Sequence, residues 1–271
     1  ITNPRDLKTF VSIMKKHKFH MISGVNTLYE ALLNYDGFKE LDFSNLLMSL
    51  SGGMAALDTT AKRWAEVTKS VIWQAYGLTE TSPLVSVNDY KQTEFTGSVG
   101  LPAAYTEIEI RDESGNALSE TNAVGELCVR GPQVMSGYWK SEVSGLDENN
   151  WFMTGDIARI DETGNIFIVD RKKDMIIVSG FNVFPNEVEA VVNEHPAVLE
   201  CGCVGVEGEN SQELVKVFIV LHDGQTATED EIISFCREKL TAYKVPKHIE
   251  FIKEIPKTNV GKVLRRELKE N

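Results

Sequence analysis

The sequence predicts an α/β protein in three parts: a largely parallel α/β sheet, a small barrel-like β subdomain and a separate, small α+β domain. Candidate helices alternate with short apolar strands in residues 1–82, which is typical of a parallel sheet. Short β-like segments separated by turns fill residues 83–172, and longer strands alternate with helices in residues 173–271. We therefore expect a large α/β unit over residues 1–172 and a small α+β unit over residues 173–271.

The composition is that of a globular protein. Of 271 residues, 42% are apolar and 25% charged, close to the usual mixture and sufficient for a packed core. The 28 Lys and Arg against 40 Asp and Glu give a net charge of −12, which argues against general nucleic-acid binding, where a basic surface is the usual footprint. No apolar run approaches the roughly 18 residues of a membrane-spanning helix, and no signal peptide is visible.

The cysteines and histidines suggest neither a disulfide framework nor a metal site. Four Cys in so long a chain favour a reducing, cytoplasmic setting. Cys201 and Cys203 share one face of a predicted strand, and without a second pair we interpret them as core residues. Because the chain begins with Ile1 rather than Met, we expect it to be a piece of a longer protein.

The first elements follow from helical and strand periodicity. Apolar residues recur at helical spacing over residues 4–16, behind Asn3 as a cap and Pro4 as the first helical residue. The alternation continues with a strand at 20–23, a helix at 26–35, a strand at 46–50, a helix at 59–69 and a strand at 71–76. Ligands bind at the carboxyl ends of such strands, and the last two strands end in Gly-Gly and Tyr-Gly pairs.

The remaining elements are shorter or differently ordered. Asp-Glu-Ser-Gly and Asp-Glu-Thr-Gly turns separate four predicted β segments, at 107–111, 126–130, 157–160 and 166–169. Pro185 marks a helix start, and Asp230 and Glu231 suit the first turn of another helix. The last unit is predicted to contain strands at 175–179, 198–206, 214–221 and 248–252, and helices at 185–194, 228–240 and 262–269.

Charge is distributed unevenly along the chain. Residues 237–271 hold ten Lys or Arg and five Asp or Glu, a local charge of +5, which leaves −17 for the rest. A solvated basic face would explain this segment. So would a role in binding an anionic ligand, and both interpretations stay open at this point.

The run Gln-Ala-Tyr-Gly-Leu-Thr-Glu at residues 74–80 follows a predicted strand. The ring of Tyr76 can stack on a base, Gly77 lets backbone approach a ligand, and Thr79 can hydrogen-bond a phosphate. Glu80 can hold Mg²⁺, which takes one or two carboxylates beside phosphate oxygens. Taken alone, the run favours the plainer explanation of a strand end followed by a helix cap.

Four further positions combine charge with glycine. Asp156, after a Thr-Gly pair, suits the hydroxyls of a ribose or an ordinary turn. The Asp-Arg-Lys-Lys-Asp cluster at 170–174 suits a solvated loop, yet lies where a hinge between domains is expected. Gly180 would allow a close approach of a ligand. Lys262 ends a run that lacks the upstream glycine of a phosphate-binding P-loop, but it suits contact with an anion, or is a surface lysine.

Taken together and in this order, these motifs resemble those of the acyl-adenylate-forming enzymes, over essentially the whole chain. Within that superfamily the chain is most similar to bacterial long-chain fatty-acid–CoA ligases, although Met153 stands where His is usual. The runs that carry the resemblance are Ser-Gly-Gly-Met at 51–54, Tyr-Gly-Leu-Thr-Glu at 76–80, Gly-Glu-Leu-Cys-Val-Arg-Gly at 125–131, Thr-Gly-Asp at 154–156, Asp-Arg-Lys-Lys-Asp at 170–174 and Gly-Lys at 261–262.

The resemblance implies a fold and a reaction. Residues 1–172 would be the C-terminal portion of a large AMP-binding domain, and residues 173–271 its small mobile C-terminal domain. Such enzymes let a fatty carboxylate attack the α-phosphate of ATP, which gives acyl-AMP and pyrophosphate. The thiol of CoA then displaces AMP and forms acyl-CoA. ATP, Mg²⁺ and CoA are therefore the implied cofactors.

The resemblance also implies the walls of an adenine site. Tyr76 would stack on the adenine ring. Gly52, Gly53 and Met54 would form the opposite wall, and Gly77 would let the backbone approach the nucleotide.

The remaining implied roles concern the phosphates, the ribose and the metal. Thr79 would contact phosphate and Glu80 would hold Mg²⁺. Asp156 would accept the ribose hydroxyls, with a charged contact from Arg171. Lys262 would bridge the fatty carboxylate and the α-phosphate, and so stabilise the charge that builds in the transition state.

Domain movement is a further implication. Lys173 falls at the hinge position, about which the small domain would rotate between the two steps. That rotation would exchange the Lys262 loop for the Gly180 loop at the active site.

Other functions for this chain stay open. They are a fatty acyl-AMP ligase, another acyl- or aryl-CoA synthetase, and a non-catalytic binding fragment. We expect the isolated chain to be nearly inactive, because the phosphate-binding loop of such enzymes lies upstream. We expect a cytoplasmic protein that does not bind nucleic acid, and leave open both a peripheral contact with the inner membrane and a homodimer.

Overall fold

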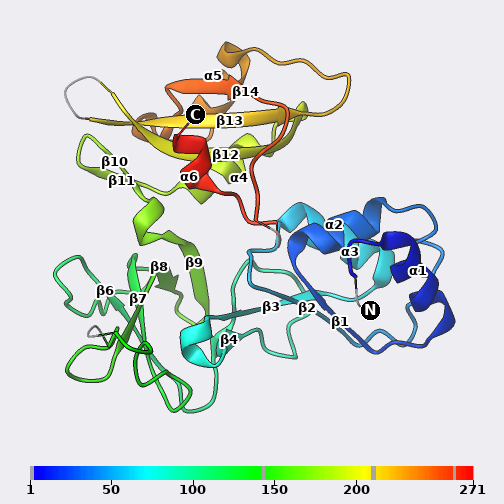
Figure 1. Cartoon of the computed structure of the whole chain (residues 1–271), viewed down its shortest axis with the longest axis horizontal. Helices are drawn as coiled ribbons and strands as arrows, with labels where there is room; N and C mark the ends of the chain where they lie inside the picture. Colours follow the sequence, from blue (N-terminus) through cyan, green and yellow to red (C-terminus); the bar gives the residue numbers. More distant parts are fainter. Residues whose placement is uncertain (1–2, 142–143, 209–211, 259–260, 271) are drawn as a thin grey trace. The chain divides into compact units, whose positions relative to one another are not determined.

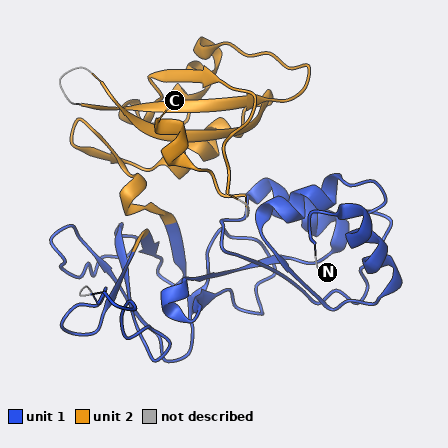
Figure 2. Ribbon diagram, in the orientation of Figure 1, with its two compact units in different colours: residues 1–154, 158–168 blue, residues 155–157, 169–271 orange. Residues whose placement is uncertain are grey.

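The computed structural model describes residues 3–141, 144–208, 212–258 and 261–270 (Figure 1). Contacts divide the chain into two units, residues 1–154 with 158–168 and residues 155–157 with 169–271 (Figure 2). The short stretch 155–157 groups with the second unit although its neighbours in the same strand belong to the first. It contains Asp156, so this candidate residue belongs to the second unit.

The first unit begins with the predicted alternation of helices and strands, which is confirmed. β1, β2 and β3 pair in parallel, and β4 and β5 extend the same sheet antiparallel, in the order β1-β2-β3-β4-β5. The sheet thus continues past residue 82. The elements are α1 (Leu7–Lys16), β1 (Met21–Gly24), α2 (Asn26–Asn34), β2 (Met48–Gly52), α3 (Asp58–Thr68), β3 (Ile72–Gly77), η1 (Thr79–Thr81), β4 (Leu84–Val87) and β5 (Leu101–Pro102).

An aromatic core joins the helices to this sheet. Trp64 of α3 is fully buried, and its ring lies 4.6 Å from that of Tyr29 of α2 in an edge-to-face contact. The indole Nε1 donates to the Ser49 hydroxyl of β2 at 2.9 Å, and that hydroxyl lies 2.9 Å from the hydroxyl of Ser70. The polar atoms of Trp64, Ser49 and Ser70 are thus hydrogen-bonded to one another inside the core, as buried polar groups usually are.

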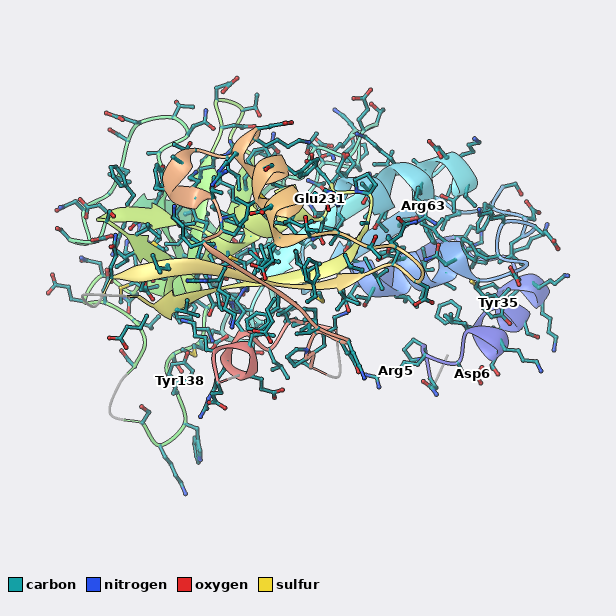
Figure 3. All side chains as sticks on the ribbon, turned by 90° about the horizontal axis from the view of Figure 1, so that it is seen from above. Arg5, Asp6, Tyr35, Arg63, Tyr138 and Glu231 are labelled. Atoms are coloured by element: carbon teal, nitrogen blue, oxygen red, sulfur yellow. The ribbon has the colours of Figure 1, made fainter. Side chains whose placement is uncertain are left out.

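The first helix starts later than the sequence pattern predicts. The predicted Asn3 cap is wrong: Asp6 is the N-cap, and its carboxylate accepts from the backbone and hydroxyl of Thr9 at 3.0 and 2.6 Å. Figure 3 labels Asp6 at the beginning of α1. Asn3 instead accepts from the Arg5 backbone in a preceding turn. An aspartate at the N-cap satisfies an orphan donor of the first turn, which is why the helix begins at Leu7.

A second sheet of four strands stands where the small barrel-like subdomain is predicted. Its order is β6-β7-β8-β9. The predicted Asp-initiated turns are confirmed, since Asp112 accepts from the backbone of Ser114 and Asp161 from that of Thr163, both at 2.9 Å. The strands are β6 (Glu107–Arg111), β7 (Gly125–Arg130), β8 (Phe152–Ile160) and β9 (Ile166–Arg171).

The second unit is an α+β arrangement around a three-stranded sheet. β12 and β13 pair antiparallel, β13 and β14 pair in parallel, and β10 and β11 form a separate hairpin whose second strand the sequence analysis missed. The elements are η2 (Lys172–Asp174), β10 (Ile176–Val178), β11 (Phe181–Val183), α4 (Pro185–Val192), β12 (Val198–Glu207), β13 (Glu213–Leu221), α5 (Glu229–Arg237), η4 (Ala242–Lys244), β14 (His248–Phe251) and α6 (Arg265–Lys269).

The helix starts of the second unit follow local rules. Pro185 occupies the first turn of α4 as predicted. α5 begins with a capping box, in which Thr228 and Glu231 satisfy each other's backbone donors, and Figure 3 labels Glu231 there. The last helix, predicted from residue 262, begins only at Arg265. Backbone groups of residues 262–264 bond to residues 256–258 instead, so Lys262 lies in a loop.

The cysteines lie in the interior as free thiols. All four are buried, and Cys201, Cys203 and Cys236 belong to the core of the second unit, which confirms their interpretation as core residues. Burial raises the pKa of Cys128 and of Cys236 to about 11, which keeps these thiols protonated and unreactive. Among the described residues, no helix combines the length and the apolar character needed to cross a membrane.

Truncation of Trp64 tests the aromatic core. We expect Trp64→Ala to lower the free energy of unfolding by about 3–5 kcal/mol, since the change leaves a cavity. Trp139→Ala is the matched control, because Trp139 is 89% exposed and its loss should cost about 0.5 kcal/mol or less. Urea unfolding followed by circular dichroism measures both. Equal losses for the two variants would contradict the packing described here.

Candidate functional site

The candidate residues of the first unit gather at one edge of its sheet. Gly52 pairs with Ala75 across the parallel strands β2 and β3, so the two strands end side by side. The loop with Gly53 and Met54 leaves β2 there, and Tyr76 is the next residue of β3. The predicted glycine and tyrosine runs are therefore neighbours at the carboxyl ends of parallel strands, where α/β sheets bind ligands.

The glycines of these runs meet different demands. Gly53 has φ +78 and nothing within 4 Å of where a Cβ would stand, so its backbone conformation is the requirement. At Gly77 an added Cβ would lie 1.7 Å from the Pro83 carbonyl oxygen. The packing of the chain itself therefore requires a glycine at 77, whatever contact with a ligand it also permits.

The turn after β3 contains an exposed threonine, Thr79, and a buried one, Thr81, that forms hydrogen bonds within the turn. Thr81 is buried, and its hydroxyl donates to the Pro83 carbonyl at 2.7 Å while accepting from the Leu78 backbone at 3.0 Å. Thr79 is exposed at the start of this turn. The structure thus leaves Thr79, the predicted phosphate contact, at the surface.

Glu80 is held by a segment that is distant in the sequence. Its Oε1 accepts from the Tyr138 hydroxyl at 2.9 Å, and its carbonyl accepts from the Met135 backbone at 2.8 Å. The bond to Glu80 raises the pKa of Tyr138; Figure 3 labels this tyrosine. In the part of the chain that the structure describes, no three His, Cys, Asp or Glu side chains cluster as a metal site would require. Glu80 would therefore supply a single carboxylate.

A buried amide organises the loop after β2. Gln74 Oε1 accepts from the Ala56 backbone at 2.9 Å, and its Nε2 donates to the Ser98 carbonyl at 3.1 Å. Asn88 completes the network by accepting from the Gln74 backbone at 2.6 Å and donating to the same Ser98 carbonyl at 2.9 Å. The sequence analysis assigned Gln74 no role. Its position was a signal that the sequence did offer, because Gln74 is a polar residue within an otherwise apolar strand.

The candidate residues of the second unit meet around Asp156. This carboxylate is 5% exposed and lies 3.3 Å from Nε of Arg171. Lys262 belongs to the same electrostatic group: partial burial of its ammonium lowers the pKa first, Arg171 lowers it further, and Asp156 opposes the shift. A carboxylate suited to ribose hydroxyls thus lies beside two cations suited to phosphate.

Lys173 follows Arg171 by two residues, and Gly180 lies in the next hairpin. Lys173 is an exposed residue of η2, directly after β9. Ser179 and Gly180 form the two-residue turn of the β10–β11 hairpin, with φ of +51 and +82, the conformation that such turns require. Nothing lies within 4 Å of an added Cβ at Gly180. Whether either residue serves as predicted, as hinge or as ligand contact, remains a prediction.

Much of the basic C-terminal segment is neutralised within its own unit. Among the described residues, five of its cations form ion pairs: Lys239 with Glu194, Lys244 with Glu187, Lys257 with Glu200, Arg265 with Glu189 and Arg266 with Glu270. Lys262 has no carboxylate within 4 Å in the described structure. The other five of the segment's ten cations form no ion pair among the described residues, so a solvated basic face and an anion-binding role both stay open.

Replacing Gln74 tests the loop after β2. In Gln74→Leu the buried Ala56 N–H and Ser98 carbonyl lose partners, so stability should fall by about 1–3 kcal/mol. The Ala56 amide should also exchange with deuterium faster than in the unchanged chain, as measured by mass spectrometry of the peptide over residues 52–57. The exposed Gln225 provides the matched Gln225→Leu control. Unchanged exchange at Ala56 would refute the role of Gln74.

Family models match both units. Residues 1–139 match the model of the AMP-binding enzyme, and residues 187–262 match the AMP-binding enzyme C-terminal domain. The chain is 52% identical to a long-chain-fatty-acid–CoA ligase of Escherichia coli O157:H7 over 100% of its own length and 48% of that relative. It is 39% identical to the enzyme of that name from Bacillus subtilis, over 96% of this chain and 47% of the relative. The chain thus spans about half the length of the curated relatives it matches.

Solved structures agree with the sequence relatives. The ATP-bound MatB of Rhodopseudomonas palustris superposes with a TM-score of 0.90 at 30% identity, over 98% of this chain and 53% of that one. The anthranilate CoA ligase AuaEII in complex with anthranoyl-AMP gives 0.86 at 30% identity, over 99% and 52%. These similarities confirm the resemblance seen in the motifs and the predicted fold class, and they show that the chain belongs to the AMP-binding enzyme family.

Proposed function

We propose that this chain supplies the C-terminal half of a long-chain fatty-acid–CoA ligase. The full-length form, meaning this chain together with the N-terminal segment that its relatives carry, would convert a fatty acid, ATP and CoA into acyl-CoA, AMP and pyrophosphate. The observation that carries the proposal is the meeting of Lys262 and Arg171 around the buried Asp156. Whole-chain identity of 52% to a ligase of that name supports the substrate class.

In the first step the chain's own residues would bind and orient ATP. Tyr76 would stack on adenine against residues 52–54, Asp156 would accept the ribose hydroxyls, and Thr79 would contact phosphate. Lys262 would place its ammonium between the fatty carboxylate and the α-phosphate. Because charge grows on the phosphate oxygens as the carboxylate attacks, a fixed cation stabilises the transition state more than the ground state.

Glu80 is the residue that would hold Mg²⁺. Tyr138 occupies Oε1, and the second carboxylate oxygen fits the single protein ligand that Mg²⁺ often takes beside phosphate oxygens and water. The metal would neutralise phosphate charge. Tyr138 would orient the carboxylate from the other side, and its loss should weaken binding of the metal–nucleotide complex without removing a ligand.

Transfer to CoA, rather than to a carrier protein, is supported by the connection between the units. β8 and β9 are joined by a short turn, and η2 follows β9 directly. The resemblance to the family implies an insertion at this place in fatty acyl-AMP ligases, and residues 157–175 contain none. In the transfer step Gly180 would contact the CoA arm, and Lys173 would serve as the hinge.

The proposal extends to location and to the isolated chain. Four free, buried thiols support a reducing, cytoplasmic setting. Contact with the inner membrane and a homodimer stay predictions from the sequence. The 271-residue chain alone should form little acyl-AMP, because its relatives are about twice as long.

Loss of the lysine charge tests the first step. In the full-length form, AMP release from ATP, palmitate and CoA should fall by about 10²–10³ in Lys262→Ala, the range seen when a group that stabilises transition-state charge is removed. Lys253→Ala, at an exposed lysine of the same unit, should keep its activity. CoA-independent adenylation would favour the acyl-AMP ligase, whereas absence of AMP with short, long and aryl acids would leave a non-catalytic fragment.

The pH profile tests the environment of Lys262. Because partial burial and Arg171 lower its pKa, the ammonium should lose its proton at a lower pH than an ordinary lysine, and kcat/KM for ATP should decline on the alkaline side. In Lys262→Arg the guanidinium stays protonated, so that decline should vanish from the residual activity. The same alkaline limb in both proteins would assign the titration to another group.

A further inference from the structure

Arg265, the first residue of α6, is surrounded by acceptors from three other elements. Its Nη2 donates to both carboxylate oxygens of Glu189 at 2.9 Å and to Asn186 Oδ1 at 2.7 Å, and its Nε donates to the Cys203 carbonyl at 3.2 Å. Nη1 lies 3.6 Å from Asp174. The side chain is only 16% exposed, so these are charge-assisted contacts largely shielded from water.

The acceptors are themselves fixed in place. Glu189 Oε1 also accepts from the Cys203 backbone at 2.8 Å, which ties α4 to β12. Asp170, 1% exposed at the end of β9, accepts from the Asn186 backbone at 2.7 Å. One guanidinium therefore joins α6 to a preformed frame of α4, β12 and the 170–174 segment.

Lys262 lies three residues before this anchor, in a loop bound at its other end as well. Thr258 donates its backbone N–H to the Lys262 carbonyl at 2.8 Å, and its hydroxyl accepts from the Lys262 backbone at 3.1 Å. Lys257 forms an ion pair with Glu200 of β12. The loop backbone is thus held on both sides, while the ammonium of Lys262 forms no ion pair among the described residues.

The Lys257–Glu200 ion pair and the Arg265 contacts constrain the loop to different degrees. The Lys257 pair is a point contact at the loop entrance. The planar guanidinium of Arg265 bonds to Glu189 and Asn186 through Nη2 and to a backbone carbonyl through Nε, so it fixes direction as well as distance. A misplacement of about 1 Å at a reacting group can cost about 10²-fold in rate.

We propose that Arg265 is a positioning residue for Lys262: its fork to Glu189, Asn186 and the Cys203 carbonyl sets the place from which Lys262 reaches the α-phosphate. The inference rests on the proposed function and adds a residue to its first step. Arg265 itself touches no substrate in this scheme. It acts through the loop backbone, so its loss should slow adenylation and spare the step in which Lys262 has no part.

The test separates the two half-reactions in the full-length form. Arg265→Lys keeps the positive charge but loses the planar guanidinium. The rate of acyl-AMP formation should therefore fall about 30-fold or more. The KM for ATP should stay within about threefold of the parent value. Thioester formation from supplied palmitoyl-AMP and CoA should stay within about threefold. Arg266→Lys is the matched control, because Arg266 is 90% exposed and pairs only with Glu270 within its own helix; both of its rates should equal those of the parent.

A second variant separates positioning from folding, since an unpaired Glu189 would destabilise the core. The double variant Arg265→Met with Glu189→Met leaves neither charge of the pair unpartnered, so its thermal transition should fall less than that of Arg265→Met alone. Adenylation should still be slow. Normal adenylation in a folded double variant, or equal losses in both half-reactions of Arg265→Lys, would overturn the proposal. Absence of acyl-AMP with the parent protein would instead refute the proposed function.

Discussion

Both candidate loops are held in place by buried polar side chains that hydrogen-bond to backbone groups. A loop at the end of a strand carries N–H and C=O groups that no sheet partner satisfies, and leaving one buried and unpaired is costly. In the first unit the amide of Gln74 meets this demand for the loop after β2. In the second unit Arg265 bonds to the Cys203 carbonyl of strand β12, and so fastens the helix that follows the Lys262 loop. Each loop is thus held from within its own unit.

Some residues of the motifs are required by the fold itself, independently of any ligand. Gly77 is required by the Pro83 carbonyl that occupies its Cβ space, and Gly180 by a hairpin turn of positive φ. Gly53 is like Gly180 in this respect, because its Cβ space is empty and only its backbone conformation demands glycine. Glycine in a motif is therefore weak evidence of a ligand contact, whereas Lys262, which forms no ion pair with any residue that the structure describes, has no such structural explanation.

What the sequence could predict was local. Alternating periodicity located the helices and strands of the first sheet, and Pro185 and the acidic first turn with Asp230 and Glu231 marked helix starts because these signals lie within a few residues. The late start of α6 depends on bonds from residues 262–264 back to residues 256–258, and Tyr138 meets Glu80 from 58 residues away. Long-range hydrogen bonds leave no periodic trace, so the sequence did not indicate these partners, and the roles of the candidate residues stay predictions.

The charge around Asp156 is opposite in sign to the net charge of the whole chain. The chain carries −12 overall, and within its basic C-terminal segment many cations are matched by glutamates of the same unit. Around Asp156, however, one carboxylate lies near two cations, Arg171 and Lys262, and the pKa of the lysine is lowered first by its partial burial and then by the charge of Arg171. An anionic phosphate would oppose this lowering, since an opposite charge favours the protonated lysine. The local excess of positive charge, against an acidic background, is the property that best suits this cluster to a nucleotide.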